Sequence, residues 1–276
     1  MHSKARANAT PVLSVAGSDC SGGAGLQADL KTFAAHGLYG MSVVLSVVAE
    51  NTSRVINSVD MPSESIFAQF DAVFEDIVPK AVKIGMLGSV SILESVEQSL
   101  ARYLPTNIVI DPVMFAKNGF PLMPESIRKE FARLLIPYAC VLTPNIPEAS
   151  ELCGFEIVSL EDMKKSALML HKMGAKSVLV KGGHKEDFAD DVLYDGKEFA
   201  VFHAKKLKST STHGTGCTLS SAIAANLALG FSLYDSIRRA KSYTYNAIAH
   251  ATPLGKGFGP TNHLYACACD PLGGLY

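Results

Sequence analysis

Short apolar runs alternate with helical patterns along almost the whole chain, and this alternation restricts the possible folds more than any other feature. The runs expected to form strands are residues 11–16, 41–49, 55–59, 81–86, 107–111, 140–143 and 177–181. The segments that repeat apolar residues at helical spacing are residues 26–36, 63–77, 89–103, 124–135, 146–152 and 160–173. Strands that alternate with helices predict an α/β fold, with a mostly parallel sheet covered by helices on both faces.

The last third of the chain completes this expectation. Residues 192–194 and 199–203, joined by a turn at Asp195-Gly196, indicate a small hairpin at the sheet edge, and residues 218–229 and 233–250 indicate two closing helices. We expect a single domain over residues 11–266, between a flexible N-terminal tail at 1–10 and a C-terminal tail at 267–276. The first ten residues are polar and basic and lack an apolar core, so they do not match a secretory signal.

The composition argues against several classes of function. The net charge is −1 and no cluster of Lys and Arg occurs, which argues against nucleic acid as a partner. No apolar run reaches the roughly 18 residues that a membrane-spanning helix needs, so we expect no membrane segment. The cysteines fit neither a disulfide framework nor a complete zinc pattern, which favours reduced thiols and a cytoplasmic protein. They are Cys20, Cys140, Cys153, Cys217, Cys267 and Cys269.

A glycine-rich turn, STHGTGCTLSS at residues 211–221, leads into the first closing helix. The N–H groups at such a turn and the positive end of the helix dipole favour an anion, most readily a phosphate. Gly214 and Gly216 would let the backbone approach that anion closely. Cys217 would lie in the first helical turn, where the same field lowers a thiol pKa. The alternative is close helix packing, with Cys217 as a small buried hydrophobe.

Polar residues gather where the expected strands end, which is the edge of an open α/β sheet where ligands bind. They are Glu50 and Asn51, Gly85 and Met86, Asp111, residues 143–148 and residues 181–184. This asymmetry favours an enzyme with a phosphate-bearing ligand. A second glycine loop, at residues 17–25, follows the first strand, but its spacing matches neither the dinucleotide-binding nor the P-loop pattern.

Five ordered sequence blocks lie between about Val12 and Tyr265. They are AGSDCSGGAGLQADLKT at 16–32, DPVM at 111–114, LTPNIPEA at 142–149, VKGGH at 180–184 and THGTGCT at 212–218. With GKGFGP at 255–260, this set resembles the signatures of the hydroxymethylpyrimidine/phosphomethylpyrimidine kinases, the thiamine-pathway branch of the ribokinase-like superfamily. The resemblance implies a ribokinase-like three-layer fold.

The resemblance also implies a reaction. The γ-phosphoryl group of ATP would pass to the hydroxymethyl group of 4-amino-5-hydroxymethyl-2-methylpyrimidine, and a second transfer onto the monophosphate would give the diphosphate. Cys217 would be the base that takes the alcohol proton, and nearby backbone amides would form the anion hole. Those amides belong to Gly214, Thr215, Gly216 and Cys217. The resemblance further implies ATP and Mg²⁺, leaves a monovalent-cation requirement open, and suggests a homodimer.

The family pattern assigns roles to further positions in this chain. The implied metal ligands are Asp111 and Glu148. The implied nucleotide contacts are Lys181, Asn145, Thr212 and Gly257. The implied contacts to the small-molecule pyrimidine substrate are Gly17, Ala24, Asp29, Glu50 and Met86.

Several of these residues have simpler interpretations. Asp111 before a proline starts a turn, Glu148 caps a helix, and Asp29 lies on a solvated helix face. His213 is expected to be structural. The segment Lys117-Asn118-Gly119 is expected to belong to a flap over the phosphates, which would exclude water.

Glu50 departs from the family pattern, because the thiamine-pathway kinases usually carry Gln at this position. A Gln amide both donates and accepts hydrogen bonds, whereas a carboxylate only accepts unless it is protonated. The departure keeps a pyridoxal or pyridoxine kinase open as the alternative. A non-catalytic nucleotide- or vitamin-binding sensor is the alternative from another class, although the presence of Cys217, Asp111 and Glu148 argues against it.

Overall fold

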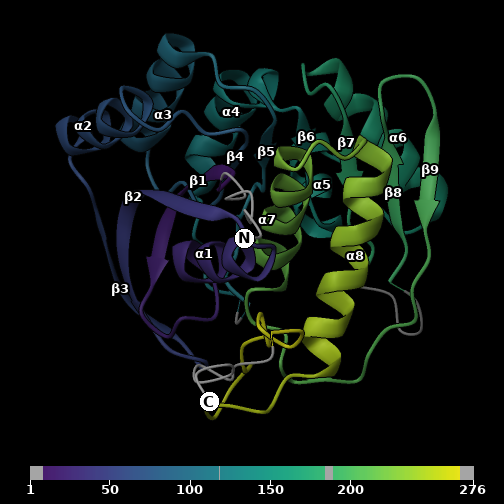
Figure 1. Cartoon of the computed structure of the whole chain (residues 1–276). Coiled ribbons are helices and arrows are strands. Elements are labelled where there is room, and N and C mark those ends of the chain that lie inside the picture. The colour runs from purple at the N-terminus through teal and green to yellow at the C-terminus, as the bar shows by residue number, and fades with distance from the viewer. Residues whose placement is uncertain (1–8, 118, 184–188, 268–276) are drawn as a thin grey trace, which may run out of the picture.

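The computed structural model describes residues 9–117, 119–183 and 189–267. Its centre is a nine-stranded sheet in the order β3-β2-β1-β4-β5-β6-β7-β8-β9 (Figure 1). The strands are β1 (Pro11–Asp19), β2 (Tyr39–Glu50), β3 (Val55–Asp60), β4 (Val82–Ile84), β5 (Ile108–Ile110), β6 (Val141–Leu142), β7 (Val178–Val180), β8 (Asp191–Tyr194) and β9 (Phe199–Phe202). The helices are α1 (Gly25–Ala35), α2 (Ser63–Phe74), α3 (Val90–Tyr103), α4 (Glu125–Leu134), α5 (Ile146–Cys153), α6 (Leu160–Lys172), α7 (Thr215–Ala228) and α8 (Leu233–Ala249).

The expected α/β architecture is confirmed. Strands β1, β2, β4, β5, β6 and β7 pair in parallel, whereas β3 at one edge and the β8–β9 hairpin at the other pair antiparallel. Every expected strand and helix is present, with shifted bounds, and a short 3-10 helix at Ile136–Tyr138 was not expected. The single-domain boundaries remain a prediction, since most of both proposed tails lies outside the described residues.

Two apolar cores, one on each side of the sheet, give three layers. Side chains from α2 to α6 pack on one face, with Leu13 and Val15 of β1 among their strand partners. Side chains from α1, α7 and α8 pack on the other face, where Val12 of β1 lies. Figure 1 shows α7 and α8 side by side in front of the sheet. Because successive strand residues face opposite sides, one strand serves both cores.

The chain reverses direction across the sheet between β1 and β4. It first runs from β1 outward to β2 and β3, and then returns to place β4 on the other side of β1. Such a switch point opens a crevice at the carboxyl ends of the two strands, where ligands bind in open α/β sheets. Helix α7 packs on β1, β4 and β5 at this place.

Within the part of the chain that the structure describes, no helix is long and apolar enough to cross a bilayer.

Candidate active site

Two glycine loops interlock at the carboxyl ends of the central strands. Gly214, which precedes α7, has a left-handed backbone with φ of 75°, and a Cβ there would lie 1.8 Å from the carbonyl oxygen of Gly23. A Cβ on Gly23 would in turn lie 2.4 Å from the ring of His213. Only glycine allows this approach, so the loop after β1 and the turn before α7 fit together as one unit.

A buried ion pair connects the same two loops. His213 Nε2 lies 2.8 Å from Asp19 Oδ2, and the Asp19 carboxylate also accepts hydrogen bonds from the N–H groups of Ser21, Gly23 and Ala24. Burial works against the charged carboxylate, but the hydrogen bonds from His213, Ser21 and Ala24 hold the pKa of Asp19 well below its usual range. The structural role expected for His213 agrees with this contact.

Glu50 lies beside this pair. Its carboxylate comes within 4.8 Å of ligand atoms of Asp19 and His213, which makes a cluster of three potential metal ligands. Burial and the neighbouring Asp19 charge raise the pKa of Glu50 to about 7, and His213 opposes them. Because Asp19 already accepts several N–H and O–H groups of its own loop, we assign the cluster to loop organisation and not to a metal.

A pocket of about 580 Å³ opens above the N-terminus of α7. This volume falls within the range of small-molecule sites. The sequence-predicted residues that line it are Ala24, Glu50, Asp111, Asn145, Glu148, Lys181, Thr212, Gly214, Thr215, Gly216 and Cys217. They come from the carboxyl ends of five strands and the segments that follow them, and from the turn before α7 and its first helical turn. The structure therefore brings together the distant positions that were expected to meet at the strand ends.

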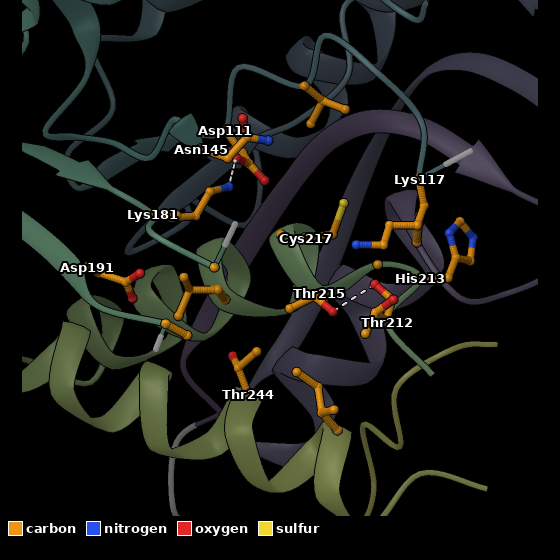
Figure 2. A pocket seen from close by; sticks show the side chains of 18 of the residues that line it. Asp111, Lys117, Asn145, Lys181, Asp191, Thr212, His213, Thr215, Cys217 and Thr244 are labelled. Atoms are coloured by element: carbon orange, nitrogen blue, oxygen red, sulfur yellow. Dashed lines mark hydrogen bonds and ion pairs between the residues drawn. The ribbon is translucent and has the colours of Figure 1, made fainter. Parts of the chain in front are cut away.

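Lys181 and Asp111 form an ion pair in the wall of this pocket. Lys181 Nζ lies 2.7 Å from Asp111 Oδ1, and the side chains are 13% and 2% exposed (Figure 2). Thr143 donates to Oδ1 at 3.1 Å and Ser220 of α7 donates to Oδ2 at 3.3 Å. A Cβ on Gly216 would lie 3.2 Å from Asp111 Oδ2 and 3.4 Å from Lys181 Nζ. The pair therefore lies directly beside the first turn of α7.

Glu148 both caps α5 and lines the pocket. The Asn145 side chain accepts from the N–H of Glu148 at 2.9 Å, and Glu148 Oε2 accepts from the N–H of Asn145 at 2.8 Å. This is a capping box, as the simpler interpretation proposed. Burial raises the pKa of Glu148 to about 7, Lys181 lowers it and Asp111 raises it further. Two carboxylates close enough to disfavour each other's charge form an environment that a cation would stabilise.

Cys217 lines the pocket in the first turn of α7, but the expected lowering of its thiol pKa is wrong. Burial raises the pKa of Cys217 to about 11, and the charges of Asp29 and Asp111 add to this effect. The ammonium of Lys83 and a hydrogen bond from the N–H of Gly25 work in the opposite direction. The helix terminus alone does not outweigh the loss of water around the sulfur.

Asp29 lies beneath the pocket and not on the solvated helix face that was the alternative. Its carboxylate is fully buried and 2.8 Å from Lys83 Nζ, and Ser14 and Ser221 also donate to it. Asp29 is absent from the lining of the pocket.

Three further expected residues lie outside the pocket lining. A Cβ on Gly17 would lie 3.0 Å from Met86 Cε, so these two residues are adjacent. Gly257 packs on the loop after β2, where its N–H donates to Thr52 Oγ1 at 3.2 Å. Lys117 of the expected flap does line the pocket, with Nζ 5.6 Å from the centre of the Phe258 ring, whereas Asn118 lies outside the described residues.

The far end of the pocket was missed by the sequence reasoning. It is lined by residues of β8 and the segment before it, of the segment after β9, and of α8. They include Ala189, Asp191, Ala204, Leu207, Lys241, Thr244, Tyr245 and Ile248. Figure 2 shows Asp191 and Thr244 on the side of the pocket away from Lys117. No motif marks these positions, because they are contributed by an edge hairpin and an amphipathic helix of ordinary composition.

Comparison with known proteins gives one consistent family. The sequence profile of the phosphomethylpyrimidine kinase family matches residues 19–262. A hydroxymethylpyrimidine/phosphomethylpyrimidine kinase from Haemophilus influenzae is 42% identical over 262 residues, 93% of this chain and 97% of that protein. The thiamine biosynthesis bifunctional protein ThiED from Geobacter sulfurreducens is 45% identical over 256 residues. The match covers 92% of this chain but 52% of ThiED, so the chain spans about half the length of that relative.

Solved structures agree with the sequence matches. The crystal structure of phosphomethylpyrimidine kinase from Clostridium difficile 630 superposes with a TM-score of 0.78 at 44% identity, over 87% of this chain and 99% of that one. An ADP complex of Bacillus subtilis pyridoxal kinase superposes with a TM-score of 0.87 at 37% identity, over 94% of this chain and 98% of that one. The chain is therefore a phosphotransferase with a ribokinase-like fold, and it belongs to the phosphomethylpyrimidine kinase family.

Proposed function

We propose that this protein phosphorylates 4-amino-5-hydroxymethyl-2-methylpyrimidine and then its monophosphate, with ATP as the donor, in thiamine biosynthesis. The observation that carries the proposal is the convergence of the family's blocks on one pocket. Loops after β1, β5, β6 and β7 and the turn before α7 all contribute to its lining. Relatives named hydroxymethylpyrimidine/phosphomethylpyrimidine kinase match the chain over more than nine-tenths of its length.

ATP would occupy the long axis of the pocket. Its base and ribose would lie at the end lined by Ala204, Thr244 and Ile248, and its phosphates would reach the first turn of α7. The N–H groups of that turn have no partners earlier in the helix, which suits them to an anion, although the N–H of Thr215 also contacts the carbonyl oxygen of Thr212 at 3.4 Å. Gly214 to Cys217 would form the anion hole for the group in transfer, with Thr212 and Asn145 beside it.

Mg²⁺ fits the donor set on the adjacent wall. Asp111 and Glu148 offer carboxylate oxygens, the ligands that this hard cation prefers, and the charge of Asp111 helps to raise the pKa of Glu148. Bound there, Mg²⁺ would neutralise charge on the phosphates of ATP. Lys181 holds Asp111 in place and its ammonium would contact a phosphate oxygen.

Cys217 is the proposed base for the alcohol proton. It lies in the pocket wall at the anion hole, so a hydroxymethyl group bound against it would have its oxygen aimed at the phosphates. As a thiolate, the sulfur would accept the proton while the alcohol oxygen attacks phosphorus. Lys83 is the charged group that favours this thiolate.

The pyrimidine would bind beside the two interlocked glycine loops. Ala24 and Glu50 line the pocket there, and Gly17 and Met86 lie next to each other behind them. Asp29 would act from below this site. Glu50 would accept a hydrogen bond from the exocyclic amine of the substrate, and in its protonated form would also donate to the ring nitrogen.

Pyridoxal kinase activity is the second candidate. Two observations favour it: pyridoxal kinases are structural neighbours with TM-scores of 0.86 and 0.87, one of them in complex with pyridoxal, and Glu50 replaces the usual Gln. One assay separates the candidates. The purified protein is given ATP and Mg²⁺ with the hydroxymethylpyrimidine, its monophosphate, pyridoxal or pyridoxine, and products are read by mass spectrometry.

We expect both pyrimidines to be phosphorylated with the higher kcat/KM. A preference for the pyridine substrates would replace the proposal with the second candidate. ATP binding without turnover of any of the four compounds would support the sensor.

A homodimer is also proposed. Val47 of β2 and Val59 of β3 are cross-strand partners, and they are 54% and 57% exposed. Exposed apolar pairs at a sheet edge are suited to association with a second copy. Light scattering of the purified protein tests this proposal, and Val47→Asp with Val59→Asp is expected to give monomers.

A further inference from the structure

Lys83 is the middle residue of strand β4. Its neighbours Val82 and Ile84 belong to the core under α2 to α6, so Lys83 faces the opposite side, toward α1 and α7. The side chain is completely buried. A lysine is almost never buried in this way without a paired carboxylate, because removing the ammonium from water is costly.

The carboxylate that pairs with Lys83 belongs to Asp29 of α1. Nζ lies 2.8 Å from both carboxylate oxygens. Ser14 of β1 and Ser221 of α7 donate to the same carboxylate, the latter at 2.6 Å. Four elements, β1, β4, α1 and α7, are thus tied to one buried ion pair.

The packing of α1 on α7 connects the Lys83–Asp29 pair to the thiol of Cys217. Ser221 follows Cys217 by one helical turn on α7, and Asp29 follows Gly25 by one helical turn on α1, so each pair shares a helix face. The two helices pack together, and the N–H of Gly25 donates to Cys217. A Cβ on Gly25 would lie 2.5 Å from the carbonyl oxygen of Gly17, so only glycine fits at this position against the end of β1.

We propose that Lys83 is a positioning residue for Cys217: through Asp29 and Ser221 it fixes α1 against α7, and its ammonium supplies the positive charge beneath the sulfur. The proposal rests on the proposed function, in which Cys217 acts as the base, but its test does not require turnover.

The charges around Cys217 predict the direction in which Lys83 shifts the thiol pKa. On α1 lies Asp29, on β4 Lys83, and beyond the ends of β5 and β7 lie Asp111 and Lys181. Burial is the main cause of the high thiol pKa, and Lys83 is the largest influence that lowers it, ahead of the opposing effect of Asp29. Although burial lowers the pKa of Lys83, Asp29 raises it above its usual range, so the ammonium stays charged at neutral pH.

The test is the rate of alkylation of Cys217 by iodoacetamide as a function of pH, without ligands. The double variant Lys83→Met with Asp29→Asn removes both charges without leaving either one unpaired. We expect its alkylation profile to move to higher pH by about half a unit, because the loss of Lys83 outweighs the loss of the opposing Asp29 charge. Below the midpoint, a shift of that size slows alkylation about threefold, because only the thiolate reacts. Peptide mass spectrometry separates Cys217 from the exposed Cys20, whose rate is the internal control.

Ser14→Ala is the matched control for a purely structural role. It removes one hydrogen bond to Asp29 and changes no charge, so it should lower the unfolding temperature and leave the alkylation profile in place. If the double variant Lys83→Met with Asp29→Asn does not fold, Lys83→Gln with Asp29→Asn provides the same test. In that variant the two side chains are uncharged but can still form hydrogen bonds.

The two proposals can fail separately. An unchanged alkylation profile in a folded double variant overturns the role of Lys83. A shifted alkylation profile together with an unshifted pH profile of kcat supports the role of Lys83 and counts against Cys217 as the base.

Discussion

Two lysine–aspartate pairs flank the start of α7, and they differ in their access to the pocket. Lys181 pairs with Asp111, and Lys83 pairs with Asp29. Adjacent residues of α7 hold the two carboxylates: Ser220 donates to Asp111 and Ser221 donates to Asp29. The first pair lines the pocket, whereas both side chains of the second are 0% exposed.

The two pairs consist of the same chemical groups, and their different burial gives them different roles. The Lys181–Asp111 pair is reachable by a ligand, so its ammonium and carboxylate would be available to a phosphate and a metal ion. In the Lys83–Asp29 pair the ammonium and the carboxylate contact only other groups of the protein that are buried with them. The pair can therefore act only by holding its helices and strands together and through its electrostatic field. We therefore expect changes in the open pair to affect turnover more than stability, and changes in the sealed pair to affect both.

Cys217→Ala removes the sulfur that lies between the two pairs, and it should have the largest effect. Loss of a general base typically costs about 10²–10⁴-fold in kcat. The unfolding temperature should change little, because alanine fits the same helical position. Steady-state kinetics with the hydroxymethylpyrimidine checks this prediction, and titration of the substrate by calorimetry should show that binding persists. Wild-type kcat in the variant would exclude the thiol from proton transfer.

Lys83→Met tests the sealed pair by leaving Asp29 buried without its cation. Breaking a buried ion pair in this way costs about 3–5 kcal/mol of folding free energy. The double variant with Asp29→Asn should recover most of that loss. Urea unfolding of the two single variants and the double variant forms a cycle that measures the coupling. Additive free energies would show that the two side chains do not stabilise each other.

Lys181→Met tests the open pair in the same way. Because Lys181 lines the pocket and is 13% exposed, water can enter the space that its ammonium leaves beside Asp111, so the stability loss should be below that of Lys83→Met. Removing a cation that stabilises charge in transfer should lower kcat by about 10²–10³-fold. Unfolding and kinetics are measured on the same preparations. A Lys181→Met variant that is less stable than Lys83→Met would contradict the predicted difference between the open and the sealed pair.

Much of this arrangement could be predicted from the sequence. The alternation of apolar runs and helical patterns predicted every strand and α-helix, though not the 3-10 helix, and the polar residues after the strands predicted that Asp111, Glu148 and Lys181 line one pocket. The strand order could not be read in the same way, because β4 pairs with β1 across the whole β2–β3 excursion. The first turn of α7 also begins earlier than the expected residue 218, since Gly214 ends the preceding loop in a left-handed conformation.

The sealed pair was missed for a physical reason. Asp29 was expected on the pocket or on a solvated helix face, and its partner Lys83 lies 54 residues away in a strand that otherwise reads as apolar. A lysine within a strand that helices cover on both faces is the available signal, because it requires a buried carboxylate. The raised pKa of Cys217 was missed as well, since the sequence shows a helix terminus but not the depth of burial.

Glu50 extends the comparison to a carboxylate that faces another carboxylate. Asp29 and Asp111 each have a lysine partner, whereas the charges beside Glu50 are Asp19, which raises its pKa, and His213, which lowers it. With burial, the resulting pKa is about 7. Below that pH a protonated Glu50 can both donate and accept, as Gln does, and above it the carboxylate can only accept.

We therefore expect the KM for the hydroxymethylpyrimidine to rise as the pH increases through about 7. The rise should be about threefold to tenfold, the value of one neutral hydrogen bond to the ring nitrogen. Glu50→Gln is close to isosteric and does not titrate, so its KM should stay at the low-pH value of the wild type throughout. Because the substrate ring itself titrates, the wild type and the variant are compared at each pH, and their ratio is the measurement. A ratio that does not change with pH would mean that Glu50 does not change its protonation in the working range.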